Sequence, residues 1–310
     1  MRNIPSFSEI KERMVPAMDQ LEGLRRSLLN DAKKKSLIYS GGILAIAVVI
    51  SLFATSNPLY GLLFGFIVAC IVSSVIFNYQ ANKLSPLYKK KVIGKLVEEL
   101  IEEGKYEPET GISEASFNQT ALYSRPDRYN SEDFISGKVG KTAFCFAEVH
   151  AEEKQVTTNS KGQTQTHWVT LFQGFMFIAD FNKDFSGQTI IQRNSIFKFG
   201  RGQRVKLENP VFEKHFDVFS TDQVEARYIL SPSLMEKLIK LDELFGNGLL
   251  VSFHHSQIVI MVKCTSNHFE ASLWRSVRDI ENLKEEYATI VSLTSIIDAL
   301  DLNTRIWSKE

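Results

Sequence analysis

Two uncharged apolar runs near the N-terminus constrain this chain of 310 residues more than any other feature. Residues 37–54 and 59–77 contain no Asp, Glu, Lys, Arg or His. Each run approaches the roughly 20 residues that cross the hydrocarbon core of a bilayer. The segment between them, Thr55 to Pro58, is polar and too short for a folded loop. We therefore predict a transmembrane helical hairpin over residues 37–78, in preference to a buried hairpin of a soluble protein.

The hairpin is predicted to be an anchor. Ionisable side chains inside a membrane span are the usual mark of an ion or proton pathway, and neither span has one. The residues that we assign to the membrane anchor are Leu37, Ile43, Val49, Leu62, Phe66 and Ile71.

Basic residues flank the hairpin and predict its orientation. Lys33, Lys34 and Lys35 precede the first span. Lys83 and the run from Lys89 to Lys91 follow the second span, whereas the turn has no charge. Cytoplasmic flanks carry an excess of Lys and Arg. Both termini and the whole of residues 79–310 are therefore predicted to be cytosolic.

Apolar residues recur at spacings of three and four before the first span: Phe7, Ile10, Met14, Ala17, Leu21, Leu24 and Leu28. This a/d pattern predicts an amphipathic helix over residues 1–36, which Pro16 kinks or divides. A comparable stripe predicts a helix over residues 79–104. The simplest structure is an antiparallel stalk, and packing on the soluble domain and a helix lying on the membrane surface are open alternatives. The pattern also predicts self-association, with Met14, Leu21, Leu24 and Leu28 as the candidate oligomer seam.

The formal net charge of zero conceals two halves of opposite sign. Residues 1–100 carry 13 Lys and Arg against 7 Asp and Glu, and the rest of the chain carries 23 against 29. An acidic domain binds phosphate backbones poorly, so we expect no nucleic-acid partner. The three cysteines form no disulfide framework and fit a reducing compartment.

Strand patterns dominate the second half of the chain. Residues 105–130 are polar, with Pro108, Gly111 and Pro126, and predict a partly helical linker before a domain over residues 131–310. The polar stretch Thr157–Thr166 is predicted to be the mobile loop of a long hairpin. Strands are predicted over residues 142–149, 167–181, 188–192, 204–208, 216–220, 249–253 and 258–264.

Two helices complete the predicted domain. The first runs over residues 232–245, with Ser231 as its N-cap and Gly246 as its stop. The second is a long C-terminal helix over residues 269–302. Because the strands follow one another in hairpin order, the fold class is α+β with an antiparallel sheet or open barrel.

Three stretches of the domain carry a resemblance to a known family. They are LFQGFMFIADF at residues 171–181, VKLENPVFEKHF at residues 205–216, and YILSPSLM at residues 228–235, and the stretch FSTDQVEAR at residues 219–227 also fits. Together they resemble the bacterial membrane family called domain of unknown function 3137, over about residues 130–265. The resemblance implies a location in the bacterial cytoplasmic (inner) membrane and assigns no activity. It also hints at a partnership with a LemA-type membrane protein.

One cluster of metal-ligand residue types stands out: His254, His255, Cys264 and His268. We interpret the histidines as surface turn residues and Cys264 as a packed core thiol, so no metal and no cofactor is predicted. Cys264 and His268 can also be drawn as a nucleophile and its base, which we regard as the weaker interpretation.

Other candidate motifs have plain structural explanations. Gly200-Arg201-Gly202 lacks the spacing of a phosphate loop and is interpreted as a turn. The acidic residues Glu208, Glu213, Asp217, Asp222 and Glu225 are expected on a solvated face. Arg227, beside Glu225 and Asp222, is expected to form a fold-fixing ion pair, with recognition of an anionic ligand as the alternative.

No catalytic motif is recognised, so a binding protein is favoured over an enzyme. The sequence predicts a membrane-anchored cytosolic binding or scaffold protein, part of a homo- or hetero-oligomeric membrane complex. A membrane-bound hydrolase and an accessory subunit of a transporter or envelope complex are the alternatives.

Overall fold

The computed structural model describes residues 4–159, 162, 164–194, 202–246 and 248–303. The chain divides into two compact units. The first comprises residues 1–96 and 269–287, and the second comprises residues 97–268 and 288–310. The fold class is α+β, as predicted.

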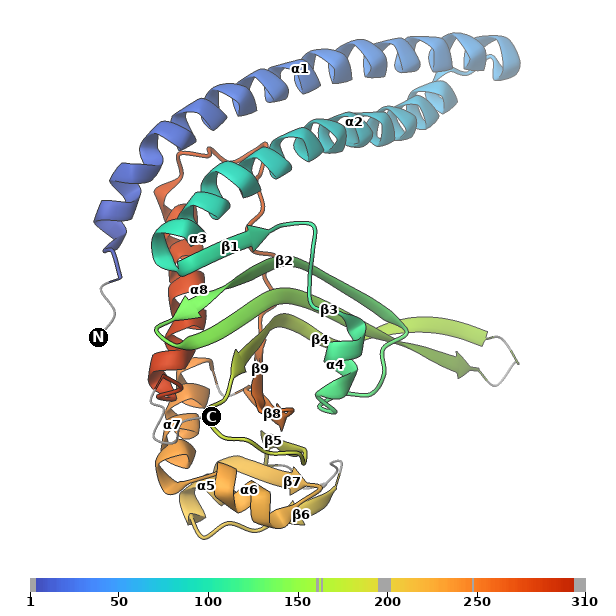
Figure 1. Cartoon of the computed structure of the whole chain (residues 1–310). Helices are drawn as coiled ribbons and strands as arrows, with labels where there is room; N and C mark the ends of the chain where they lie inside the picture. The colour runs from blue at the N-terminus through green and yellow to red at the C-terminus, as the bar shows by residue number, and fades with distance from the viewer. Residues whose placement is uncertain (1–3, 160–161, 163, 195–201, 247, 304–310) are drawn as a thin grey trace. The chain divides into compact units, whose positions relative to one another are not determined.

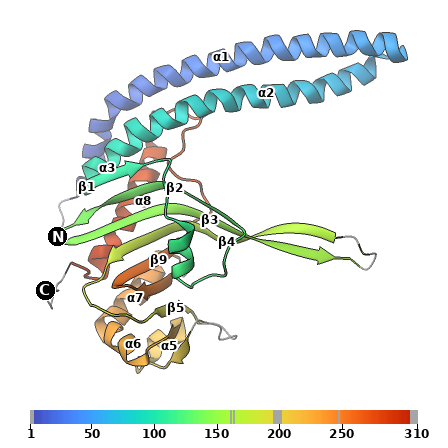
Figure 2. The same cartoon turned by 45° about the vertical axis from the view of Figure 1, so that its right-hand side comes forward.

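Two long helices make up most of the first unit. α1 (Phe7–Thr55) begins at a capping box, in which Ser6 accepts from the Glu9 N–H and the Glu9 carboxylate accepts from the Ser6 N–H. α1 passes through Pro16 as one helix. α2 (Pro58–Tyr88) continues as a π-helix, η1 (Lys89–Ile93), and then as α3 (Gly94–Leu100). Figures 1 and 2 show α1 and α2 side by side as an antiparallel pair.

The predicted turn joins the two helices. Ser56 adopts the left-handed conformation that ends α1, with φ of 54°. Asn57 then caps α2 by accepting from the Leu59 N–H at 3.0 Å, and Pro58 occupies the first helical turn. Two short polar residues and a proline are therefore enough to reverse the chain.

Small residues let the two helices approach closely. A Cβ atom built on Gly61 would lie 2.4 Å from the backbone oxygen of Ala47, and one on Gly65 would lie 2.9 Å from the Ala47 Cβ. Further along the pair, Ser73 Oγ lies 2.8 Å from Ser36 Oγ and 2.9 Å from Ser40 Oγ. Gly, Ala and Ser at helix contacts are typical of membrane helix pairs.

The segment 269–279 differs from the prediction. It belongs to the predicted C-terminal helix, but the structure begins that helix, α8 (Ile280–Ala299), only at Ile280. Side chains of α1 and η1 hold the segment instead, because Glu22 accepts from the Val277 N–H and Lys89 pairs with Glu270 at 2.6 Å. Tertiary contacts here override a pattern that looks helical.

The second unit is built on an antiparallel sheet. In the described part of the chain it has nine strands in the order β1-β2-β3-β4-β9-β8-β5-β7-β6, open at both ends. The strands are β1 (Glu102–Glu107), β2 (Arg128–Val139), β3 (Thr142–Thr158), β4 (Thr164–Asp180), β5 (Thr189–Arg193), β6 (Gln203–Val205), β7 (Phe216–Ser220), β8 (Leu250–His254) and β9 (Gln257–Lys263).

Short helices flank these strands. They are α4 (Glu114–Gln119), α5 (Pro210–His215), α6 (Gln223–Ile229) and α7 (Pro232–Leu244). α7 begins and ends as predicted, since Ser231 accepts from the Leu234 N–H and Gly246 has φ of 77°. Residues 105–130, predicted as a partly helical linker, contain the end of β1, all of α4 and the start of β2.

Apolar side chains of three central strands form a core with α4. Phe117 of α4 is 1% exposed and packs its ring against Phe172 and Tyr123. The buried members of this cluster are Ile112, Phe117, Ala147, Val149, Ala151, Phe172, Met176, Val259 and Met261. The core therefore lies between the middle of the sheet and the segment before β2.

β3 and β4 extend past the neighbouring strands as a two-stranded arm, which we define as residues 153–159 and 164–170 (Figures 1 and 2). β2 pairs with β3 only as far as Glu152, and β9 pairs with β4 only from Gly174. The predicted loop over Thr157–Thr166 is therefore too long, because Thr157 pairs with Gln165 and Thr158 with Thr164. Its residues 160, 161 and 163 lie outside the described part of the chain.

Candidate functional site

The residues assigned to the anchor lie on α1 and α2. Leu37, Val49, Leu62, Phe66 and Ile71 are exposed within the chain, and Ile43 is half-buried. In the described residues, α1 and α2 are the two helices that are long and apolar enough to cross a membrane. Only 6% of the apolar stretch of α1 and 17% of that of α2 is buried within the chain, whereas a core helix of a soluble protein is mostly buried.

The candidate seam divides into two parts. Met14 is 0% exposed and Leu21 is 2% exposed within the single chain. Leu24 and Leu28 are half-buried. Half of the seam is thus covered without a second copy of the chain, and self-association stays a prediction.

The four metal-ligand residue types occupy two different places. His254 ends β8 and is buried, which corrects its interpretation as a surface residue; burial lowers its pKa to about 4. Its Nδ1 lies 3.2 Å from Ser252 Oγ. His255 is exposed in the turn before β9. Cys264 and His268 meet elsewhere, beyond the other end of β9.

Cys264 and His268 form a close pair. Cys264 follows β9 directly, and its Sγ lies 3.1 Å from His268 Nε2. The thiol is half-buried rather than packed in the core, which corrects the interpretation as a core thiol. It lines a cavity of about 220 Å³ whose wall is largely polar: Asn130, Glu132, Glu148, Val149, His150, Gln173, Gly174, Cys264, Ser266 and Asn267.

The backbone around the pair is closely packed. The Cys264 N–H donates to the Gln173 carbonyl oxygen at 3.1 Å. Gly174 has φ of 148°, and a Cβ there would lie 2.1 Å from the Val262 carbonyl oxygen. Only glycine allows β4 and β9 to approach so closely at this point. The position of the thiol is therefore set by strand pairing.

Glu148, on β3, joins the pair to the sheet. Its Oε1 accepts from the His268 N–H at 2.9 Å. Burial raises the pKa of this carboxyl to about 7. Glu148 could not be predicted from the sequence, because a contact that spans 120 residues leaves no mark in local spacing.

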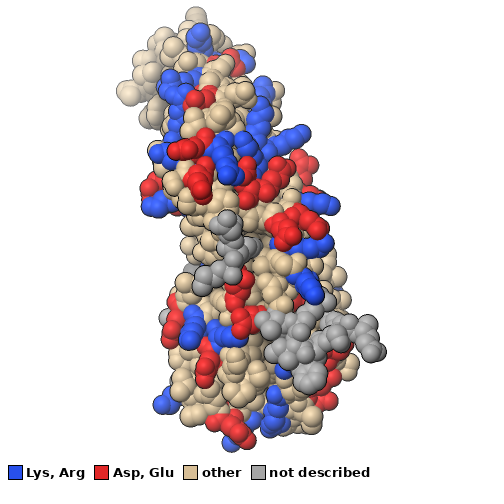
Figure 3. All heavy atoms as spheres, turned by 60° about the vertical axis from the view of Figure 1, so that its left-hand side comes forward, with Lys and Arg blue, Asp and Glu red and all other residues tan. Residues whose placement is uncertain are grey.

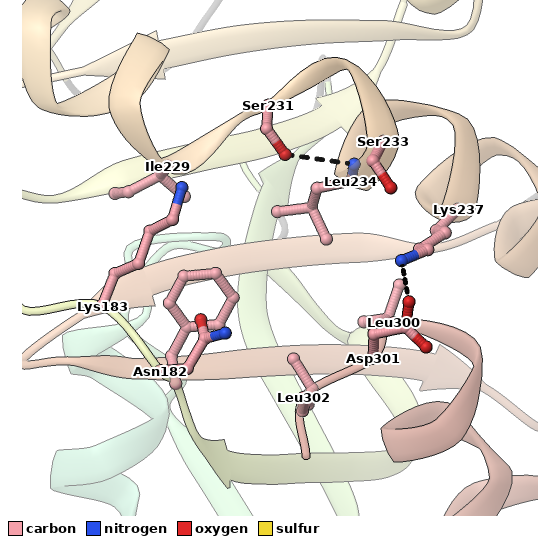
Figure 4. A pocket seen from close by; sticks show the side chains of 11 residues that line it. Asn182, Lys183, Ile229, Ser231, Ser233, Leu234, Lys237, Leu300, Asp301 and Leu302 are labelled. Atoms are coloured by element: carbon pink, nitrogen blue, oxygen red, sulfur yellow. Dashed lines mark hydrogen bonds and ion pairs between the residues drawn. The ribbon is translucent and has the colours of Figure 1, made fainter. Parts of the chain in front are cut away.

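A second cavity, of about 310 Å³, lies among the turn after β4, the start of α7 and the end of α8 (Figure 4). Leu234, Leu300 and Leu302 give it an apolar floor. Lys237 pairs with Asp301 on one side, and Lys183 lies on the other side. The Lys183 ammonium donates to the Tyr228 carbonyl oxygen, and burial lowers its pKa.

Arg227 does not form the expected ion pair. Its guanidinium donates to the Gln223 carbonyl oxygen at 2.9 Å and, at 3.4 Å, to that of Lys206, and no carboxylate in the described residues lies within ion-pair distance. Glu225 instead accepts from the Ser186 and Gly187 N–H groups. Arg227 lines a hollow of about 480 Å³ beside Glu208 and Leu230, so the alternative of anion recognition stays a prediction.

The acidic series is not a uniform solvated face. Asp217 is 1% exposed and pairs with Arg204 at 3.0 Å, which corrects the expectation for this residue. Asp222 caps α6, and Glu208 is exposed. The predicted turn at Gly200-Arg201-Gly202 falls mostly outside the described residues. Acidic and basic side chains alternate over the face in Figure 3, so charge alone marks no site there.

Comparison with known proteins finds that part of this domain is similar to a known family. Residues 170–302 match a family described as "Protein of unknown function (DUF3137)". This stretch of the chain is similar to that family. The resemblance drawn from the sequence is thereby confirmed, although the matched range begins and ends later than the expected 130–265.

The DUF3137 match includes Cys264 and His268 and excludes Glu148. No protein of curated function matches the chain. A similar solved structure is the crystal structure of the mycobacterial trehalose monomycolate transport factor A, TtfA. It is 10% identical over 64% of this chain and 88% of that chain, with a TM-score of 0.34. A likeness this weak establishes neither fold nor function.

Proposed function

We propose that the protein is a membrane-anchored binding protein whose soluble domain engages a partner protein through the arm. The observation that carries the proposal is the exposure of the side chains of the arm on both of its faces. Every described residue from Lys154 to Asn159 and from Thr164 to Thr170 is exposed.

The anchor supports the membrane part of the proposal. Large apolar side chains point outward from the helix pair, among them Phe53 at 89% exposure and Phe64 at 68%. In water, each such side chain would lack the stabilisation of about 1.5–3 kcal/mol that full burial provides. Within a bilayer they face lipid, and the helical backbone satisfies its own polar groups. An outward apolar surface of this kind suits a membrane span and not a soluble hairpin.

The flanking lysines support a cytosolic domain. Lys33, Lys34 and Lys35 lie on α1 just before the apolar stretch, and the turn at Ser56 and Asn57 has no charge. Lys89 is an exception among the lysines after the second span, because it is buried against Glu270. The remaining lysines, Lys83, Lys90 and Lys91, still favour a cytosolic placement under the positive-inside rule.

The arm has the chemistry of a strand-addition site. Beyond Glu152 and before Gly174, the outer edges of β3 and β4 have no neighbouring strand in the described residues. Residues 153–159 and 164–170 are rich in Thr, Val and Gln, without proline. At the base of the arm, a register shift at Ala151 and Glu152 and a hydrogen bond from the Lys154 N–H to the Asp127 carboxylate protect the edge. Residues 155–159 and 164–170 carry no Asp, Glu, Lys, Arg or Pro, and an edge of this kind accepts an extended segment of another protein.

One aromatic and one aliphatic side chain add a contact surface on the arm. Trp168 is 36% exposed. The Arg128 guanidinium lies over its ring, with its central carbon 3.4 Å from the ring centroid. Val156 is 56% exposed and pairs with Thr166. Lys154 pairs with Trp168, so Trp168 and Val156 lie on the same face of the arm. A partner strand at this edge would extend the sheet and place its own side chains alongside those of Trp168 and Val156.

The test removes the arm without disturbing the sheet. Glu153 and Val169 are paired across the strands, so replacing residues 154–168 with Asn-Gly joins them by a two-residue turn. A photo-crosslinking amino acid at Gln165 of the full-length protein in intact membranes is expected to give one discrete adduct. The same group at Val224, which is 78% exposed on α6, is the control and is expected to give none.

The arm-less variant carries the group at Val169 instead and is expected to remain in the membrane fraction without the adduct. An adduct that persists without the arm, or that forms equally from Val224, would refute the proposal. So would the absence of any adduct from Gln165.

A further inference from the structure

The Cys264–His268 pair has the arrangement of a nucleophile and its base. The 3.1 Å separation between Sγ and Nε2 is short enough for proton transfer from sulfur to imidazole. The thiol also faces the 220 Å³ cavity, so a small molecule can reach it. A thiol packed in a core would have no such opening.

Contacts of the backbone and of the imidazole ring hold His268 in place. Its backbone N–H donates to Glu148, and its ring packs against Phe175 with 5.4 Å between the ring centroids. The other ring nitrogen, Nδ1, lies 3.5 Å from Thr289 Oγ1, at the limit of a hydrogen bond. With Nδ1 toward Thr289, Nε2 is directed at the sulfur. A base that a third group orients in this way is typical of activated thiols.

We propose that Cys264 is a nucleophile, activated by His268, that accepts an acyl group from a small ester or thioester in this cavity. The inference is independent of the arm and of the proposed partner binding. It assigns a chemical role to the second unit, which the family match does not.

The proposed step is a simple acyl transfer. His268 Nε2 takes the thiol proton, and the thiolate forms a bond to the acyl carbon of the donor. The bond from that carbon to the leaving oxygen or sulfur then breaks, and the imidazolium returns its proton to the leaving group. The products are S-acyl Cys264 and the free alcohol or thiol, with no change of oxidation state.

The lining of the cavity selects the donor. Glu132 and Glu148 bring carboxyl groups to the wall, together with His150. Glu132 disfavours an anionic substrate, whereas the raised pKa of Glu148, about 7, leaves that carboxyl only partly charged at neutral pH, so a neutral donor is favoured. A volume of about 220 Å³ has room for a short acyl chain and not for a long lipid.

The first experiment measures the reactivity of the thiol in the full-length protein. Cys70→Ser and Cys145→Ser leave Cys264 as the single thiol. Iodoacetamide alkylation of Cys264 is followed from pH 5.5 to 9.5. Proton transfer to an adjacent imidazole produces the thiolate, which is the form that iodoacetamide alkylates. We expect alkylation at pH 6.5 to fall about tenfold or more in His268→Asn.

A second variant tests the same proposal if His268→Asn does not fold. Thr289→Val removes the hydroxyl beside Nδ1 and leaves the imidazole in place, so a partial reduction in rate is expected. Equal rates at pH 6.5 for the single-thiol protein and its His268→Asn variant, with both folded by circular dichroism, would overturn the proposal. One zinc per chain that is lost with Cys264→Ser would also overturn it, because the thiol would then be a metal ligand.

The second experiment tests acyl transfer. With 4-nitrophenyl acetate, we expect a burst of about one 4-nitrophenolate per chain and an acetyl group on the peptide that contains Cys264. Cys264→Ser is expected to lose the burst. Alkylation that depends on His268 without any acetylated Cys264 would contradict the acyl donor as the substrate class.

Discussion

The carboxylate of Glu22, on α1, accepts a hydrogen bond from the backbone N–H of Val277 at 3.0 Å, across 255 residues of sequence. Ser276 Oγ donates to the same carboxylate at 3.1 Å. Arg25 completes the arrangement: it pairs with Glu22 at 2.9 Å and donates to the Leu273 carbonyl oxygen. One buried acid thus holds the segment 269–279 against the first long helix.

Replacing Glu22 with Gln is expected to destabilise the first unit by about 3 kcal/mol at neutral pH, because the nearly buried Arg25 loses its counter-charge. The measurement is thermal unfolding of the detergent-solubilised protein. Glu12→Gln, an exposed site on the same helix, is the control. An unchanged midpoint for Glu22→Gln would show that the ion pair contributes nothing.

The same acid predicts a dependence on pH. Arg25 holds the pKa of Glu22 well below its ordinary value of 4.5. A carboxyl with a depressed pKa stabilises the folded state fully above the unfolded pKa, and this stability is lost as the pH falls further. We therefore expect the gap in midpoint between the wild type and Glu22→Gln to shrink below about pH 4.5. A gap that stays constant down to pH 3 would contradict this assignment.

The sequence predicted elements whose signal is local. Uncharged runs marked both apolar helices, the residues Thr55 to Pro58 marked the turn, and Ser231, Pro232 and Gly246 marked α7. β2 was missed because Arg128–Val139 is polar and half-buried, and β1 because it is a short strand at the edge of the sheet. The start of α8 was placed too early, since Glu22 and Lys89 hold residues that an amphipathic pattern assigns to a helix.

The candidate site was predictable in one part only. The spacing of Cys264 and His268 drew attention to the pair, but its separation and its cavity depend on the meeting of β4 and β9 at Gly174. Glu148 comes from β3, far away in sequence. Arg227 was misjudged for the opposite reason, because closeness in sequence to Glu225 and Asp222 does not bring the side chains together when Asp222 caps the helix.

Close helix packing in the hairpin predicts a difference between two glycines. Gly61→Ala would place a Cβ 2.4 Å from the Ala47 backbone oxygen, whereas Gly41→Ala would meet nothing within 4 Å. Overpacking against backbone costs about 1–3 kcal/mol, so Gly61→Ala is expected to lower the unfolding midpoint in detergent. Gly41→Ala is the matched control and is expected to leave it unchanged. Equal midpoints would mean that α1 and α2 do not touch at Gly61 in the membrane.

Topology is tested by labelling single cysteines in intact cells. A Cys at Asn57, in the turn between the spans, is expected to react with a membrane-impermeant maleimide. A Cys at Thr158, in the exposed arm, is expected to react only after the cells are opened. Labelling of Thr158→Cys from outside would reverse the proposed orientation.

Self-association is the last prediction, and the structure sharpens it. Met14 and Leu21 are buried within one chain, so charge at either residue would disturb the folding of the stalk itself. Leu24 and Leu28 are half-buried one helical turn apart, which leaves them available to a second copy. Each such side chain contributes up to about 1.5–3 kcal/mol when it is fully buried.

Leu24→Glu with Leu28→Glu is therefore expected to shift the detergent-solubilised mass from oligomer to monomer without a large change in unfolding midpoint. Leu21→Glu alone is expected to lower the unfolding midpoint, because it places a charge at a site that is buried within the single chain. A wild-type protein that is already monomeric would show that Leu24 and Leu28, although half-buried, hold no second copy of the chain. Partner binding would then depend on the arm.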